Sequence, residues 1–398
     1  MARLPRAAWI LYVGTFINKF GNFLSVFLVL YLTAKGYSAA VAGVALGIVG
    51  AGNFIGNMLG GTLADRIGRR PAIAVSMFGS GVCTLMVPLA SNMAILLPLV
   101  GVIGIFAQLY RPASGAVLLD VVGDDSRTIA FAVYRLAINV GMAAGPLIGG
   151  ILSQHSYTWI FFGDAASSIV YGLIALTLLP ETKPHPVTET AKPANRTGGY
   201  RTVFGDYRFV LFLLGITAAT YIYIQSTATL PLQVRDSHLP NSFYGLLLTI
   251  NAIVVVCVEL PLTHLLQRWP ALALTALGLI PLGVGFACTA FAHSASIFII
   301  TVLIWTAGEM IMMPSASAYP GRYAAPELRG RYQGAFGLAQ TVATCVGPAI
   351  GGYLYSVNHT LNWTVCGIVA VVGVIVIAAS VPQRTKIHKP EATRTSSV

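Results

Sequence analysis

The sequence predicts an all-α membrane protein in which twelve transmembrane helices form two pseudo-symmetric six-helix bundles. Of its 398 residues, 56% are hydrophobic and only 9% are charged, whereas soluble domains carry roughly 25% charged residues. The second half also repeats the first. GPLIGG at 145–150 returns as GPAIGG at 347–352, a shift of 202 positions (347 minus 145). Duplicated halves in a lipid-embedded chain are typical of transporters that open to each side of the membrane in turn.

Twelve apolar stretches are long enough to cross a bilayer, which takes about 20 helical residues. Short loops join most of them, so we expect consecutive helices to be antiparallel neighbours. An even number of spans also places both termini on one side of the membrane. The predicted spans are 8–33, 40–63, 71–91, 94–119, 128–153, 158–179, 207–233, 241–266, 270–291, 295–319, 331–355 and 362–381.

Positive charge orients these helices. Of the 24 Lys and Arg residues, all but five fall in loops on one side of the predicted membrane. Lys35 and Arg235 fall on the other side, and Lys19, Arg111 and Arg135 lie within spans. Because positively charged loops stay in the cytoplasm, we expect both termini to be cytoplasmic and the chain to lie in the cell inner (plasma) membrane. Topology thus accounts for the net charge of +11, and no nucleic-acid partner is expected.

One long polar segment separates the two halves. It is rich in proline, lysine and threonine, so it cannot bury a core. We therefore predict an N-terminal bundle at 1–180, a cytoplasmic linker at 181–206, a C-terminal bundle at 207–382 and a basic cytoplasmic tail at 383–398.

The sequence shows no arrangement of residues typical of catalysis, metal binding or ATP hydrolysis. Its five cysteines lie in apolar helices without CxxC spacing, and it has no GxxxxGK[ST] loop. We therefore expect no enzymatic activity, no metal and no cofactor. Two repeats without a filter-like segment also argue against an ion channel.

The loop between the second and third spans, GTLADRIGRR at 61–70, predicts a conformational latch. Gly61 would let two helices approach closely, and Gly68 permits a tight turn. Asp65 lies near a helix end, where it can complement the positive N-terminus of another helix.

Besides Asp65, the arginines of this loop can reach a carboxylate on another helix. Asp120, at the cytoplasmic end of the fourth span, is the expected partner of Arg69 or Arg70, and Arg66 completes the charged set. The alternative is a solvated turn whose arginines only set the topology. In the second half, the matching loop at 265–270 has lost nearly all of this pattern, so the latch is expected on one side only.

Two motifs resemble those of the major facilitator superfamily. The loop at 61–70 is similar to its signature G-x-L-a-D-r-x-G-r-r. The fifth span, GxxxGPxxGG, resembles its antiporter signature through Gly141, Gly145, Pro146, Gly149 and Gly150. Glycines four apart allow close helix contact and Pro146 bends the helix, although a generic packing face would look the same.

The resemblance covers nearly the whole chain and is closest to the twelve-span drug:proton antiporter type. It implies a monomer with a central cavity open to one side at a time. It also implies that the loop network latches the outward-facing state, and that small lipophilic or cationic compounds are exported as protons enter. The expected partners are therefore a small-molecule substrate, protons and the lipid bilayer.

Ionisable residues within the spans are the candidates for proton coupling. Burial penalises the charged form of a carboxylate, so such a group can hold a proton near neutral pH. We expect Glu309 in the tenth span first, then Glu259 in the eighth and Asp164 in the sixth; pairing with a cation or a helix end is the alternative for each. Arg111 in the fourth span resembles an arginine that the family uses in proton coupling, and a structural hydrogen-bonding hub is its alternative.

Polar and aromatic residues at middle depth are the candidates for substrate binding, with a core or interface position as the alternative. They are Asn22, Asn53, Asn57, Tyr134, Arg135, Asn139, Tyr221, Tyr223, Gln225, Trp305 and Gln340.

Two other functions remain open. One is a proton-coupled uptake porter for a nutrient such as a sugar or peptide, although the first span lacks the E-x-x-E-R pattern of peptide porters in this superfamily. The other is a lipid or lipoprotein-precursor flippase of the same fold, which hydrophobic cavity walls would suit.

Overall fold

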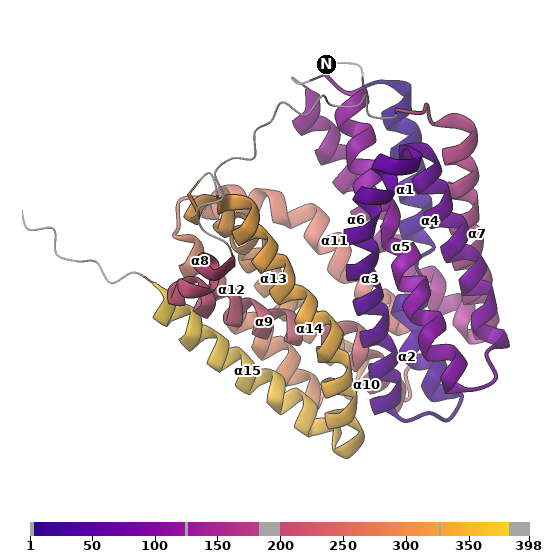
Figure 1. Ribbon diagram of the computed structural model, residues 1–398. Coiled ribbons are helices and arrows are strands. Elements are labelled where there is room, and N and C mark those ends of the chain that lie inside the picture. Colours follow the sequence, from indigo (N-terminus) through magenta and orange to yellow (C-terminus); the bar gives the residue numbers. More distant parts are fainter. Residues whose placement is uncertain (1–3, 124–125, 183–199, 326–327, 382–398) are drawn as a thin grey trace, which may run out of the picture.

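The computed structural model describes residues 4–123, 126–182, 200–325 and 328–381. These residues form helices without a strand, arranged as two bundles that stand side by side (Figure 1). The all-α fold with two bundles is therefore confirmed.

The N-terminal bundle follows the chain from indigo to magenta in Figure 1. Its elements are α1 (Arg6–Phe20), α2 (Leu24–Ala34), α3 (Ala39–Ile67), α4 (Arg69–Met86), the 3₁₀ turn η1 (Val87–Leu89), α5 (Met93–Val121), α6 (Arg127–His155) and α7 (Tyr157–Leu178).

The C-terminal bundle repeats this plan after one short extra helix. Its elements are α8 (Tyr200–Gly205), α9 (Tyr207–Ala228), α10 (Leu230–Asp236), α11 (Asn241–Leu266), α12 (Ala271–Cys288), the 3₁₀ turn η3 (Thr289–Phe291), α13 (Ala295–Tyr323), α14 (Arg329–Val357) and α15 (His359–Ser380). Helix α8 lies inside the segment predicted as a linker at 181–206. The part of that linker at 183–199 and the predicted tail at 383–398 lie outside the described residues.

Eleven spans in the described part of the chain are long and apolar enough to cross a membrane. The predicted span at 331–355 is not among them, although α14 contains it and is 29 residues long. Gln340, Thr341 and Thr344 of α14 line a cavity between the bundles, and such residues lower its mean hydropathy. The expected helix is therefore present, and it is less apolar than the other predicted spans.

The first span of each bundle is broken, and the last helix of the same bundle supports the break. Between α1 and α2, the backbone N–H of Leu24 donates to Asp164 Oδ2 of α7 at 2.8 Å. Between α9 and α10, Asn362 of α15 donates to the hydroxyl of Thr229 at 3.0 Å. In the N-terminal bundle the side chain of Asp164 thus bonds a backbone N–H that the break would otherwise leave unpaired. In the C-terminal bundle Asn362 bonds a side chain at the break, the Thr229 hydroxyl, which also donates to Gln225.

The bundles meet through α3 against α14 and α6 against α11. A Cβ on Gly43 would lie 2.1 Å from the carbonyl oxygen of Pro348, and a Cβ on Gly245 would lie 2.1 Å from that of Pro146. The shift of 202 positions relates these two contacts, because 43 maps to 245 and 146 maps to 348. The backbones therefore touch at two symmetry-related points that only glycine permits.

Both backbone contacts lie toward the outer ends of the helices. From this end, near α2 and α10, the bundles diverge toward the end where α1 begins (Figure 1). The positive-inside rule places that end in the cytoplasm, so on this orientation the structure is closed on the outside and open toward the cytoplasm.

Candidate transport site

A cavity of about 440 Å³ lies between the two bundles, on the side where α3 and α5 face α14. Amides and hydroxyls dominate its polar lining, and Arg111 is its one formally charged side chain. It therefore brings together Asn53, Asn57, Gln340 and Arg111, which the sequence predicted separately. The full lining is Gly50, Asn53, Phe54, Asn57, Gln108, Arg111, Gly334, Gly337, Leu338, Gln340, Thr341 and Thr344.

The Arg111 side chain is exposed to this cavity. It forms no hydrogen bond or ion pair with another residue that the structure describes. The sequence predicted an arginine buried inside the span; the structure corrects this, because α5 turns this position toward the opening between the bundles.

A smaller polar cavity of about 50 Å³ lies inside the N-terminal bundle. Asn22, Lys19 and Asp164 line it, and it shares Asn53 and Gln108 with the larger cavity, so the two adjoin. The Lys19 ammonium lies 5.5 Å from the ring centroid of Tyr110, which is within the range of a cation–π contact.

Asp164 is buried at the break between α1 and α2, where it accepts the hydrogen bond from Leu24 described above. This is the pairing with a helix end that the sequence left open as its alternative role. Its part in proton coupling stays a prediction.

Glu309 lies on α13 in a cluster of neutral hydrogen-bonding groups. Asn251 of α11 donates to Glu309 Oε2 at 2.9 Å and to the Thr306 hydroxyl at 3.0 Å. The Tyr223 hydroxyl is a second hydrogen-bonding neighbour of the carboxylate. The structure thus joins two predicted residues, Glu309 and Tyr223, through Asn251, which the sequence analysis missed. Its signal was an amide within the apolar run at 245–258.

The remaining predicted residues are not brought into these cavities. Trp305 is only 1% exposed and stacks on Phe286, with ring centroids 5.3 Å apart. Gln225 is buried and donates to the carbonyl oxygens of Tyr221 and Gly347 inside the C-terminal bundle. The others that line neither cavity are Tyr134, Arg135, Asn139, Tyr221 and Glu259.

The glycine motif of α6 serves two contacts. A Cβ on Gly141 or Gly145 would collide with the α1 backbone, at 2.9 Å from the oxygen of Phe16 and 2.4 Å from that of Phe20. Gly149 packs against phenylalanine rings of the same bundle, whereas Gly150 lies against the N-terminus of α11 in the other bundle. With Pro146 against Gly245, the motif joins the broken first span to the opposite bundle.

The charged loop at 61–70 contains the predicted ion pair. Arg69 Nε lies 2.8 Å from Asp120 Oδ2, and Arg70 donates to the carbonyl oxygen of Leu176. Gly68 has φ of 98°, a backbone conformation that glycine adopts readily. The carboxylate at the N-terminus of α4 belongs to Glu181, which accepts from the backbone N–H of Arg69 at 3.0 Å.

Two details of this loop differ from the expectation. Gly60, not Gly61, makes the close approach: a Cβ on Gly60 would lie 2.2 Å from the Leu109 oxygen, whereas one on Gly61 would make only an ordinary contact at 4.0 Å. The helical period explains this correction, because Gly56 and Gly60 share the face that packs on α5. Asp65 is exposed, as is Arg66, and Asp65 bonds to no residue in the described part of the chain.

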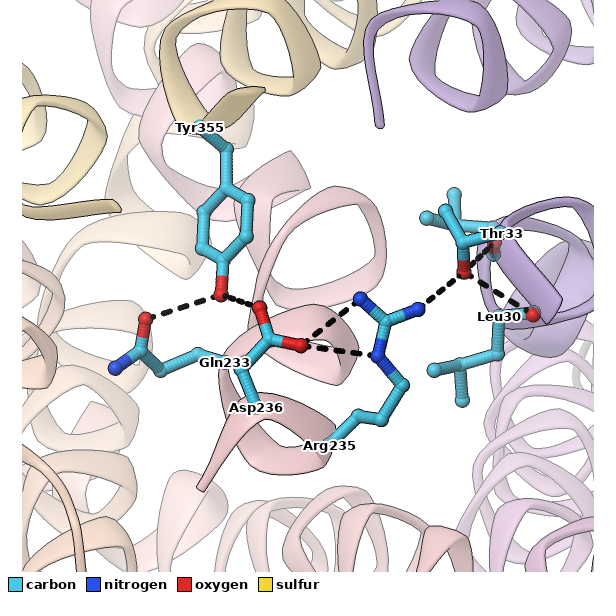
Figure 2. Close-up of polar contacts among 7 residues, drawn as sticks. Leu30, Thr33, Gln233, Arg235, Asp236 and Tyr355 are labelled. Atoms are coloured by element: carbon cyan, nitrogen blue, oxygen red, sulfur yellow. Dashed lines mark hydrogen bonds and ion pairs between the residues drawn. The ribbon is translucent and has the colours of Figure 1, made fainter. Parts of the chain in front are cut away.

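A polar contact joins the bundles at their outer ends (Figure 2). Arg235 of α10 donates to the Thr33 hydroxyl of α2 at 2.7 Å and pairs with Asp236 at 2.9 Å. Asp236 also accepts from the Tyr355 hydroxyl at 2.8 Å. The sequence analysis used Arg235 only as a topology signal and missed this contact.

Two broken-helix bundles around a cavity open to one side define a membrane transporter fold. A family model described as Major Facilitator Superfamily matches residues 11–348 and 211–397. The chain therefore belongs to the major facilitator superfamily, and it is a multi-pass inner-membrane transporter of the secondary type.

Several relatives align with most of the chain. The uncharacterized MFS-type transporter YqjV of Bacillus subtilis (strain 168) is 30% identical over 354 residues, which cover 87% of this chain and 85% of the relative. The multidrug resistance protein MdtH of Enterobacter sp. (strain 638) is 24% identical and covers 87% of each chain. A Na(+), Li(+), K(+)/H(+) antiporter of Planococcus maritimus is 23% identical and covers 81% of this chain and 83% of its own.

Solved structures agree on the fold. A bacterial homolog of the human lysosomal transporter Spinster, in an inward-facing and occupied conformation, has a TM-score of 0.76 at 14% identity, covering 94% of this chain and 96% of that one. An auto-inhibited peptide transporter of the POT family has the same TM-score at 15% identity and the same coverage.

Proposed function

We propose that this chain exports small lipophilic or cationic compounds in exchange for protons by alternating access. The observation that carries this proposal is the surroundings of Glu309. The neutral amide of Asn251 donates to its carboxylate, the Tyr223 hydroxyl is its neighbour, and no Lys or Arg that the structure describes pairs with it. A carboxylate without a fixed cation can take up and release a proton, because neither form is locked by a salt bridge.

Efflux is favoured over uptake by the glycine motif of α6. The resemblance to the antiporter signature implies export, and the motif lies between the broken first span and the opposite bundle. Relatives named as a multidrug resistance protein and a cation/proton antiporter support the same direction of transport.

The contacts of α3 with α14 support the predicted latch. Toward the outside, α3 lies against α14 at Ala39 with Gly352, Gly43 with Pro348, and Gly47 with Cys345. Continued along both helices toward the cytoplasm, this register brings Asp65 opposite the N-terminus of α14, which begins at Arg329.

The cytoplasmic side is open in this structure, so Asp65 is unpaired. When the bundles close there, its carboxylate would meet the positive end of α14 and stabilise the outward-facing state. The Arg69–Asp120 ion pair would hold the loop at 61–70 in place while the cytoplasmic side is open.

The proposal is tested by proton movement across liposomes that contain the purified protein. Compounds of cationic, neutral and anionic character are added on one side, and a pH-sensitive dye reports the other. We expect a transported compound to move protons in the opposite direction, and Glu309→Gln to reduce this movement to the level of protein-free liposomes. Glu309→Asp is the matched control, because it keeps a carboxyl group.

Two outcomes would contradict the proposal. One is proton movement in the same direction as the compound, which would identify an uptake porter. The other is full transport with every pH difference collapsed, which would remove proton coupling.

A further inference from the structure

We propose that Arg111 binds an anionic group of the substrate, so that the transported compounds include small organic anions with an apolar portion. This inference rests on the proposed transport function and specifies the substrate class of the cavity between the bundles. It differs from the expectation of cationic compounds because it follows the charges that actually line the cavity.

The lining of that cavity has one formal charge, and it is positive. Around Arg111 lie the amides of Asn53, Asn57, Gln108 and Gln340, which can donate hydrogen bonds to oxygen atoms. Phe54 and Leu338 add apolar surface. A volume of about 440 Å³ is within the usual range for a small-molecule site, roughly 300–1,000 Å³.

No carboxylate in the described part of the chain neutralises Arg111. Asp164 bonds the N-terminus of α2, Asp120 pairs with Arg69, and Glu309 lies in its own cluster on α13. Glu259 does not line the cavity. The Arg111 guanidinium is exposed to the cavity and has no carboxylate partner there, so its donors are available to an anionic ligand.

Asp164 offsets the other cation near this site. Lys19 and Asp164 both line the smaller cavity, which shares Asn53 and Gln108 with the larger one. Their formal charges cancel, so the net positive charge of the two adjoining cavities is that of Arg111. Screening by water is weaker in such a cavity than at an open surface.

The chemistry of Arg111 suits a planar anion. A guanidinium presents a rigid fork of donors that matches a carboxylate with two parallel hydrogen bonds. The surrounding amides can then orient the rest of the molecule. Phosphate and sulfonate share the anionic chemistry but not the planar two-oxygen match, so the carboxylate is the preferred group.

The test compares three probes of one shape at neutral pH: 4-phenylbutanoate, 4-phenylbutanamide and 4-phenylbutylamine. Their binding to the full-length protein in lipid nanodiscs is measured by calorimetry, without a proton gradient. We expect the carboxylate to bind about tenfold to a hundredfold more tightly than the amide, as one charge-assisted contact would give. The amine should bind no more tightly than the amide.

Arg111→Gln should lower the affinity for the carboxylate to that for the amide. Arg111→Lys should keep part of the preference, because it retains the charge without the fork. Arg208→Gln is the matched control. It removes the same charge from an exposed position whose hydrogen bond is to the neighbouring Tyr207, so it should leave the preference intact.

Equal affinity for all three probes, a preference for the amine, or an unchanged carboxylate preference in Arg111→Gln would overturn the inference. Such results would not contradict proton-driven export, which the liposome assay tests independently. Conversely, carboxylate binding that depends on Arg111, without any proton movement, would refute the export mechanism and keep the binding site.

Discussion

The two bundles share a backbone plan but differ in the side chains that carry charge. Gly43 and Gly245 are related by the 202-residue shift and make the same contact with a proline carbonyl. In contrast, Arg111 corresponds to Met313, and Glu309 corresponds to Ala107. Residues related by the duplication form the contacts between the bundles. Arg111 and Glu309 have no charged counterpart, so the N-terminal bundle carries this cation and the C-terminal bundle carries this carboxylate.

The symmetric backbone contacts are therefore suited to the motion of the bundles, and the asymmetric charged residues are suited to binding a proton or a substrate. Symmetric contacts suit a rocking motion, because the same hinge geometry serves both sides of the interface. An asymmetric distribution of charge lets a proton and a substrate act on different bundles. Either ligand shifts the equilibrium between the two access states only through unequal affinity for those states.

The largest effect is expected when the carboxylates of the two bundles are compared. Glu309→Gln should abolish substrate-induced proton movement, because the amide cannot carry a proton. Asp164→Asn should retain most of it, because the amide oxygen still accepts from Leu24. The liposome assay measures both variants side by side. Loss of coupling in Asp164→Asn, in a protein of normal stability, would transfer the proton-carrying role to the N-terminal bundle.

The symmetric glycines give the next largest effect. Alanine at Gly43 or Gly245 places a Cβ against a proline carbonyl, which we expect to destabilise the inward-facing state by about 1–3 kcal/mol. Spin labels at Lys35 and Ser356, both exposed at the outer ends of opposite bundles, should report a shift to longer distances in both variants. Gly115→Ala is the control, because nothing lies within 4 Å of its added Cβ. A shift for only one of the two variants would contradict the claim that the contacts of Gly43 and Gly245 are equivalent.

A change of similar or smaller size is expected at the α1–α2 break. Asp164→Leu leaves the Leu24 N–H without its acceptor, a loss of about 1–3 kcal/mol for a buried donor. Thermal unfolding should therefore begin at a lower temperature than for Asp164→Asn. Equal stability of the two variants would show that this hydrogen bond does not hold the break.

The smallest effect is expected for the latch. Asp65→Asn removes a charge that would face the N-terminus of α14, a contribution of about 0.3–1 kcal/mol near a helix end. We expect a modest shift of the resting population toward the inward-facing state, seen as a longer distance between labels at Leu119 and Arg322. An unchanged distance distribution would exclude Asp65 from the latch.

Much of the fold followed from composition and repetition. Low charge, apolar stretches and the shift of 202 positions predicted two bundles, and eleven spans met that description. Helix α14 did not, because Gln340, Thr341 and Thr344 line the cavity between the bundles and lower its mean hydropathy. Average composition does not show which residues of a helix face a cavity.

The site was only partly predictable. Topology predicted the Arg69–Asp120 pair, because the loop at 61–70 and the end of the fourth span lie on the same side of the membrane. Asn251, Asn362 and Arg235 were missed because each bonds a side chain in another span. Their partners depend on how the helices rotate about their axes, which a one-dimensional pattern does not specify. For the same reason Gly60 rather than Gly61 proved to be the contact residue.

Proton release on binding tests Glu309 most directly. A transported compound is added to the purified protein in weakly buffered solution, and a pH indicator counts the protons released. We predict release from the unmodified protein and from Asp164→Asn, and none from Glu309→Gln despite retained binding. Equal release from Glu309→Gln would contradict the assignment of proton exchange to this carboxylate.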